Sequence, residues 1–258
     1  PTVGGFDVQR AGGVSYAGAA GALNRATTLG GAYSSFITTT GANVVAVARR
    51  EDALRDWAET TDGNTAFVAA DLGDIASLTD VVSDISSAFG DVDILINAAG
   101  LNPRQNADDI TPKVWAQTQD INLNAPFFLA QAMVPAMREQ SWGRIINFAS
   151  LQSVRAFENG IAYGAAKGGV VQMTRAMAQA WSRDGITANA IAPGFFPTEL
   201  TAPVFADPVL AQKNADQTCV GRNGTMDDLA GPVQFLCSDA SAYITGQTLF
   251  VDGGFTAK

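Results

Sequence analysis

The chain has 258 residues, of which 47% are hydrophobic and 16% are charged, and its formal net charge at pH 7 is −9. These values are sufficient for one substantial core, so we expect a single domain over residues 1–258. The acidic balance argues against a nucleic-acid partner, because phosphate backbones are bound by clustered Lys and Arg. We find no apolar run near the roughly 20 residues that span a bilayer and no secretory leader pattern, so we expect a cytoplasmic protein without membrane contact.

The histidine and cysteine content narrows the chemistry. The chain contains no histidine, which excludes Ser-His-Asp and Cys-His catalysis and HExxH zinc sites. Its two cysteines, Cys219 and Cys237, lack zinc-site spacing and are too few for a disulfide framework. We interpret both as buried thiols and expect no metal site. Proton transfer near neutral pH must then use Tyr, Lys, Asp, Glu or Cys.

The first patterned segment is YAGAAGALNRATTLGG, residues 16–31, which looks like a glycine-rich turn leading into a helix. Six apolar runs follow, and we expect strands at 43–48, 65–72, 92–100, 143–150, 186–194 and 247–254. Helices are expected at 51–61, 75–89, 111–138, 161–183 and 226–238. This alternation predicts an α/β fold with a doubly wound parallel sheet flanked by helices. Ligands of such sheets bind beyond the carboxyl ends of the strands.

Three polar residues follow this rule. Ser150 ends the run at 143–150, and Tyr163 begins the motif YGAAK, which places Lys167 four positions later. On a helix this spacing puts Tyr163 and Lys167 on one face. A neighbouring ammonium would lower the pKa of the phenol, which is ordinarily near 10, and so make it a usable base. The alternative interpretation is an ordinary amphipathic pair.

Several motifs in order extend this pattern from Gly41 to Gly254. They are NAAG (97–100), INLNAPF (121–127), YGAAK (163–167), IAPGFFPT (191–198) and TGQTLFVDGG (245–254). With them the chain resembles the short-chain dehydrogenase/reductase family. The resemblance implies a single-domain Rossmann-like fold and an oxidoreductase that interconverts a secondary alcohol and a ketone by hydride transfer.

The resemblance also implies a role for each matching residue. Tyr163 would be the general acid/base, and Lys167 would lower its pKa and bind the nicotinamide ribose. Ser150 would orient the substrate carbonyl, and Asn122 would hold a water in a proton relay with Lys167. The other expected cofactor contacts are Gly18, Arg49, Asp71, Leu72, Asn97, Gly100, Pro193, Gly194 and Thr198. Taken singly, Asn122, Gly100 and Thr198 could instead serve as a helix kink, a turn and a helix start.

The residues after the run at 43–48 bear on the choice of cofactor. Ala48 stands where an NAD enzyme would place an acid that binds the ribose hydroxyls, and Arg49 follows it. A guanidinium without a neighbouring acid favours a 2′-phosphate, so we expect NADP, with NAD as the alternative. Arg49 and Arg50 could also be a solvated pair at a helix start.

Residues 11–40 depart from the family pattern TGxxxGxG. The best superposition keeps Gly18 and the Arg25-Ala26 pair but places Ala17, Ala22 and Asn24 where the family has Thr and two glycines. Side chains at those glycine positions should weaken the contact with pyrophosphate. A divergent loop, an altered sequence in this segment and a loss of nucleotide binding are the three explanations.

The segments ASLQSVRAF, residues 149–157, and PGFFPTELTAPVFADP, residues 193–208, resemble the branch that contains gluconate 5-dehydrogenase. We therefore expect a sugar acid or polyol as the substrate, with Arg104, Gln152 and Arg155 as contacts, because guanidinium groups bind carboxylates. The alternatives are a 3-oxoacyl carrier-protein reductase and a non-catalytic binding protein with impaired nucleotide binding. Family members are commonly homotetramers, so we expect this assembly here.

Overall fold

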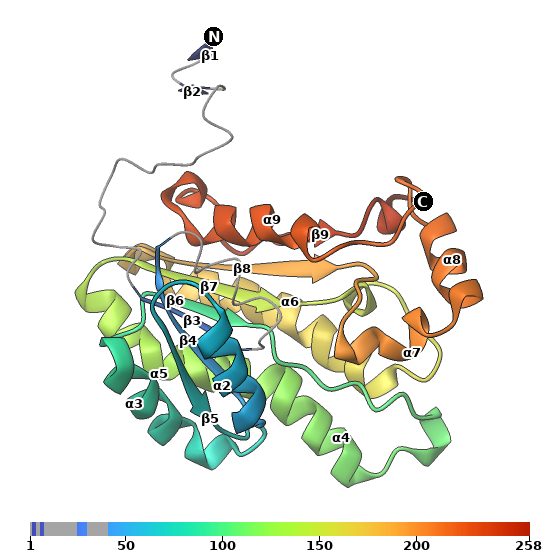
Figure 1. Ribbon diagram of the computed structural model, residues 1–258, viewed down its shortest axis with the longest axis horizontal. Coiled ribbons are helices and arrows are strands. Elements are labelled where there is room, and N and C mark those ends of the chain that lie inside the picture. Colours follow the sequence, from blue (N-terminus) through green and yellow to red (C-terminus); the bar gives the residue numbers. More distant parts are fainter. Residues whose placement is uncertain (1, 4–5, 8–24, 30–40) are drawn as a thin grey trace.

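The structure is a computed structural model that describes residues 2–3, 6–7, 25–29 and 41–258. Its main feature is a sheet of parallel strands, shown in Figure 1. In spatial order they are β5 (Thr65–Ala69), β4 (Asn43–Ala48), β3 (Arg25–Leu29), β6 (Ile94–Asn97), β7 (Gly143–Phe148), β8 (Ile186–Pro193) and β9 (Thr248–Val251). A separate antiparallel pair joins β1 (Thr2–Val3) to β2 (Phe6–Asp7). The predicted parallel α/β architecture is confirmed.

Helices cover both faces of the sheet. Helices α3 (Leu78–Phe89), α5 (Ala125–Glu139) and α6 (Ile161–Trp181) pack their apolar side chains into one core, which includes Ile85, Leu129 and Met177. Helix α9 (Asp227–Cys237) covers the other face through Leu229 and Val233, and Trp57 of α2 (Glu51–Thr60) packs against the same core. Strands β4, β6, β7 and β8 are buried along nearly their whole length, which explains their near-continuous apolar sequence. Within the described residues, no helix is both long and apolar enough to cross a bilayer.

The order of the strands reverses at β3. This strand pairs with β4 on one side and with β6 on the other, so the chain builds the sheet outward in two directions. In doubly wound sheets a crevice forms at this point, beyond the carboxyl ends of the strands. The topology therefore places the residues that follow β4 and β6 on either side of one crevice.

Two expectations about elements are corrected. Residues 25–29 form the central strand β3, although we expected a turn leading into a helix there. The β-branched pair Thr27 and Thr28 is compatible with a strand flanked by two others. The helix expected at 111–138 is divided into α4 (Pro112–Gln119), a π-helical turn at Asp120–Asn124, and α5.

The region between 195 and 225, for which we expected no element, contains helices α7 (Ala202–Phe205) and α8 (Pro208–Asp216). A local signal was present for α8. Asp207 caps the helix by accepting hydrogen bonds from the backbone N–H groups of Val209 and Leu210, and Pro208 occupies the first helical position. An acidic cap followed by proline is a typical helix start.

The two cysteines differ in their surroundings. Cys237 is buried, as predicted, and burial raises the pKa of its thiol to about 12. Cys219 is exposed, so its interpretation as a buried thiol is wrong. Its Sγ donates a hydrogen bond to the carbonyl oxygen of Gly254 at 3.3 Å, which leaves the side chain at the surface.

Candidate active site

A cavity of about 1390 Å³ lies where the strand ends meet. Residues that follow β4, β5, β6, β7 and β8 all line it, as the topology requires. Of the residues predicted from the sequence, it brings together Arg49, Asp71, Leu72, Gly100, Arg104, Ser150, Gln152, Arg155, Tyr163, Lys167, Pro193, Gly194 and Thr198. Asn97 and Asn122 lie behind its wall, and Gly18 lies outside the described residues. The individual roles of these residues stay predictions.

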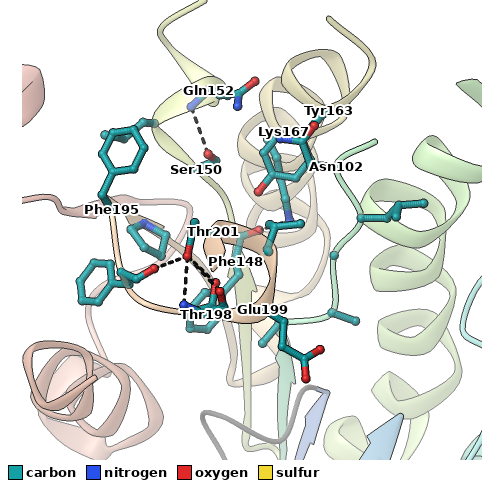
Figure 2. Close-up of a pocket in the computed structure, with 18 of the residues that line it drawn as sticks. Asn102, Phe148, Ser150, Gln152, Tyr163, Lys167, Phe195, Thr198, Glu199 and Thr201 are labelled. Atoms are coloured by element: carbon teal, nitrogen blue, oxygen red, sulfur yellow. Dashed lines mark hydrogen bonds between the residues drawn. The ribbon is translucent and has the colours of Figure 1, made fainter. Parts of the chain in front are cut away.

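Ser150 and Tyr163 meet at one wall of this cavity. Ser150 lies two residues beyond the end of β7 and caps a short 3₁₀ turn, where its Oγ accepts a hydrogen bond from the backbone N–H of Gln152 at 3.1 Å. Tyr163 lies in the first turn of α6. Figure 2 shows its hydroxyl pointing toward Ser150, whose side chain acts to lower the pKa of the phenol. Both hydroxyl groups can therefore contact one oxygen atom of a ligand.

The phenol of Tyr163 is protonated at neutral pH in this structure. Burial raises its pKa to about 12, and the hydrogen bond with Ser150 and the positive charge of Arg104 oppose that shift only in part. This result differs from our expectation that Lys167 lowers the pKa of Tyr163. Desolvation outweighs the neighbouring charges because the phenolate would lose most of its hydration. In this state Tyr163 can donate a proton.

Lys167 is also buried, with 3% of its surface exposed. Its Nζ donates a hydrogen bond to the carbonyl oxygen of Phe148 at 2.6 Å and lies 5.6 Å from the centroid of the Tyr163 ring. Burial lowers the pKa of Lys167 to about 8. Its ammonium therefore changes protonation state close to physiological pH, at a position next to the phenol.

Asn122 supports this wall from behind. Its Nδ2 donates hydrogen bonds to the carbonyl oxygens of Leu101 and Thr118, each at 2.8 Å, and its Oδ1 accepts one from the N–H of Leu101 at 3.2 Å. Asn122 thus holds the segment after β6 against the π-helical turn. A Cβ atom at Gly100 would lie 3.1 Å from Asn122 Oδ1 and 4.0 Å from Lys167 Nζ, so Gly100 lies between these two side chains.

Asn97 is directed away from the cavity. It is 2% exposed, and its Nδ2 donates hydrogen bonds to Asn147 Oδ1 at 2.8 Å and to the carbonyl oxygen of Pro126 at 3.4 Å. Its side chain therefore joins β6 to β7 and α5. The backbone that follows it, at Ala98, Ala99 and Gly100, is the part that lines the cavity.

The opposite end of the cavity fits a phosphorylated nucleotide. Arg49 is exposed directly after β4 and makes no ion pair with any described residue, whereas Arg50 pairs with Glu199. Ala48 adds no negative charge there. An uncommitted guanidinium on a cavity wall is a typical phosphate ligand. Asp71, at the end of the neighbouring strand, accepts a hydrogen bond from the N–H of Gly73 at 2.9 Å and completes this side of the cavity.

The predicted substrate contacts lie on the side of Tyr163. Arg104 donates a hydrogen bond to the carbonyl oxygen of Leu200 at 3.3 Å, and its charge reaches the phenol. Arg155 donates to the carbonyl oxygen of Lys258 at 2.9 Å. The Oε1 of Gln152 is buried without a hydrogen-bond partner.

Sequence reasoning missed two groups of residues on this side. One is an aromatic cluster of Phe157, Phe195 and Phe255, and the other is the face of α8 at Leu210, Lys213, Asn214 and Gln217. The aromatic residues come from three separate segments, so no local pattern indicates their contact. The capped start at Asp207 and Pro208 indicates α8 but not which of its faces meets the cavity.

Comparison with known proteins gives consistent matches. The sequence pattern of a family described as enoyl-(acyl carrier protein) reductase matches residues 21–256. Gluconate 5-dehydrogenase of Gluconobacter oxydans (strain 621H) is 37% identical over 222 residues, which cover 84% of this chain and 86% of that protein. The 3-oxoacyl-[acyl-carrier-protein] reductase of Escherichia coli (strain K12) is 33% identical over 229 residues, covering 88% of this chain and 92% of its own.

A solved structure of a similar enzyme matches the fold of this chain. The crystal structure of a gluconate 5-dehydrogenase from Burkholderia cenocepacia J2315, in complex with NADP and tartrate, superposes with a TM-score of 0.84 at 32% identity. The match covers 92% of this chain and 97% of that one. The similarity therefore extends over nearly the whole of both chains.

Proposed function

The chain belongs to the short-chain dehydrogenase/reductase family, and from this premise we propose that it interconverts the secondary alcohol and the ketone of a sugar acid or polyol with NADP. It is an NAD(P)-dependent oxidoreductase that acts on CH–OH groups. One observation carries the proposal: Ser150, Tyr163 and Lys167 line the same cavity as Arg49.

The catalytic role of this chain is proton transfer and orientation. In the reductive direction, the protonated phenol of Tyr163 donates its proton to the substrate carbonyl oxygen, and Ser150 donates a second hydrogen bond to that oxygen. The nicotinamide, when bound, supplies the hydride to the carbonyl carbon. The ammonium of Lys167 then stabilises the phenolate that remains, because an adjacent positive charge favours the ionised phenol. Oxidation of the alcohol reverses these steps.

The choice of NADP rests on Arg49. Its guanidinium has no acidic partner among the described residues, and Ala48 leaves room for a 2′-phosphate. An acid at that position would repel the phosphate. The Burkholderia enzyme, which shares this fold, was crystallised with NADP. NADP is therefore the better fit, and NAD is the alternative.

The substrate class rests on charge and on relatives. Arg104 and Arg155 place two positive charges at the cavity of an acidic protein, which suits a substrate carboxylate. The relative with 37% identity acts on gluconate according to its name, and the structure that superposes carries tartrate. The 3-oxoacyl carrier-protein reductase remains a second candidate because of the E. coli relative.

We also propose a cytoplasmic homotetramer. Trp115 on α4 and Phe128 on α5 are 40% and 39% exposed, which suits burial against another subunit. Both cysteines are free thiols, in keeping with a reducing compartment. Light scattering at micromolar concentration measures the assembly directly.

The proposal is tested by cofactor titration and a substrate panel. NADPH and NADH are titrated while nicotinamide fluorescence is followed, and D-gluconate, other sugar acids, polyols and acetoacetyl coenzyme A are then assayed with the preferred cofactor. We expect tighter binding of NADPH and turnover of at least one sugar acid or polyol. If neither nucleotide binds at millimolar concentration, the proposed oxidoreductase function is refuted. Turnover of acetoacetyl coenzyme A alone would favour the second candidate function, that of a 3-oxoacyl carrier-protein reductase.

A further inference from the structure

Helix α8 presents a mixed face to the cavity. The cavity is lined here by Leu210, Lys213, Asn214 and, at the C-cap of the helix, Gln217. The last three follow Leu210 by three, four and seven residues. This spacing defines one side of a helix. The capping hydrogen bonds from the N–H groups of Val209 and Leu210 to Asp207 fix where α8 begins.

Asn214 is the buried polar member of this face. The residue is 6% exposed, its side-chain amide makes no hydrogen bond to a described residue, and the amide faces the cavity rather than the closed interior. Asn223 behaves differently, because its Nδ2 donates to the carbonyl oxygen of Ala211 at 2.9 Å. An amide that faces a cavity can exchange water for a polar group of a ligand. The amide of Asn214 is therefore available to a ligand of the cavity.

The two arginines at this end contact other groups of the protein as well as the cavity. Arg155 donates to the carbonyl oxygen of Lys258 and lies 5.8 Å above the ring centroid of Phe255. Arg104 donates to the carbonyl oxygen of Leu200. The amide of Asn214 can thus offer a ligand both a donor and an acceptor that no described residue occupies.

The aromatic cluster supplies an apolar wall in the same cavity. The ring centroids of Phe157 and Phe195 are 6.1 Å apart, those of Phe195 and Phe255 are 5.8 Å apart, and those of Phe157 and Phe255 are 6.2 Å apart. Phe195 directly follows the Pro193–Gly194 turn, and Figure 2 shows it on the same side as Gln152. A carbon chain with C–H bonds on one side and hydroxyl groups on another fits such a cavity.

We propose that Asn214 is a specificity residue that hydrogen-bonds to a substrate hydroxyl group away from the reacting carbon. This inference rests on the proposed function, because it assumes a polyhydroxylated substrate. Helix α8 holds the amide at the cavity wall, where a substrate hydroxyl group can bond to it. A secondary alcohol without further hydroxyl groups gains nothing from Asn214.

The experiment compares Asn214→Leu and Asn214→Ala with the wild-type enzyme. The matched control is Gln212→Leu, since Gln212 lies on the same helix but is exposed and bonds to Asp216. KM and kcat are measured with NADP for the best sugar acid or polyol of the panel and for butan-2-ol, and melting temperatures are recorded for all variants. Leucine replaces the amide with a side chain of similar size and no polar atoms.

We expect KM for the hydroxylated substrate to rise about tenfold in both Asn214 variants, the loss typical of one hydrogen bond, with kcat within about twofold. KM for butan-2-ol should not change. The melting temperature of Asn214→Leu should equal or exceed that of the wild type, because no existing hydrogen bond is lost.

An unchanged KM in the Asn214 variants, or an equal rise in KM for butan-2-ol, would overturn the inference. A lower melting temperature with unchanged KM would also overturn it and make Asn214 a structural residue. If the wild-type enzyme oxidises no sugar acid or polyol, the proposed function fails first and the inference fails with it. The wild-type assay therefore separates the two failures.

Discussion

The Nζ of Lys167 lies 2.6 Å from the carbonyl oxygen of Phe148, so one hydrogen bond joins the catalytic helix α6 to the end of strand β7. Ser150 follows Phe148 by two residues, and Tyr163 precedes Lys167 by one helical turn. This bond therefore links the two segments that carry Ser150 and Tyr163. It also gives the buried ammonium a partner, which partly offsets its loss of hydration.

Lys167 should make stability depend on pH. Burial lowers its pKa from 10.5 to about 8, so between these values the unfolded chain binds more protons than the folded one, and stability rises with pH. The unfolding free energies of the cofactor-free wild type and of Lys167→Met are measured by urea denaturation at pH 7.5 and at pH 10.5. Relative to the variant, the wild type should gain about 3 kcal/mol of unfolding free energy between the two pH values. A difference that stays constant across this range would contradict the lowered pKa.

Replacement of Tyr163 by phenylalanine should remove the proton donor and leave the nucleotide site intact. We expect kcat to fall by about a thousandfold, a typical loss for a general acid/base, and the dissociation constant for NADPH to stay within about twofold. Stopped-flow turnover and fluorescence titration measure the two effects. Tyr243→Phe is the control, because Tyr243 is fully exposed. Retained turnover in Tyr163→Phe would refute the assigned role.

Arg49→Ala should discriminate between the two nicotinamide cofactors. The loss of one charged contact with a 2′-phosphate should raise the dissociation constant for NADPH about tenfold or more and leave that for NADH unchanged. Arg55→Ala serves as the control, since Arg55 pairs with Glu51 along α2 and does not line the cavity. Equal weakening of both nucleotides by Arg49→Ala would argue against a 2′-phosphate contact.

Asn122→Leu should damage the wall behind Lys167. The substitution leaves the N–H and the carbonyl oxygen of Leu101 without their side-chain partner, so we expect a loss of about 3 kcal/mol in unfolding free energy. Asn124→Ala removes a single bond to Asp120 and should cost less than about 1 kcal/mol. Chemical denaturation of the two variants provides the comparison. An equal loss of unfolding free energy in the two variants would show that the hydrogen bonds of Asn122 to Leu101 stabilise the fold no more than the single bond of Asn124 does.

Much of the site follows from local patterns in the sequence. The apolar runs predict the strands, and the carboxyl-end rule predicts that Arg49, Gly100, Ser150 and Gly194 line one cavity. The spacing of Tyr163 and Lys167 predicts their common helix. These features depend on residues close in sequence, where backbone periodicity decides which side chains share a face.

The N-terminal segment and the substrate side were less predictable. Residues 25–29 form β3 because β4 and β6 flank them, and no feature of that segment alone indicates two parallel neighbours. The direction of Asn97, toward Asn147, depends in the same way on a neighbouring strand. Gly18 lies outside the described residues, so its contact with pyrophosphate stays a prediction.

The sequence by itself determined the fold class, the family and the residue types available for catalysis, because strand periodicity, motif order and the lack of histidine can all be read locally. Only the tertiary structure decided the protonation of Tyr163 and Lys167 and the position of Asn214 on the cavity wall. The physical reason is that desolvation depends on how completely distant segments cover a group. Hydrogen-bond partners such as Phe148 and cavity-facing positions such as that of Asn214 are likewise set by packing between those segments.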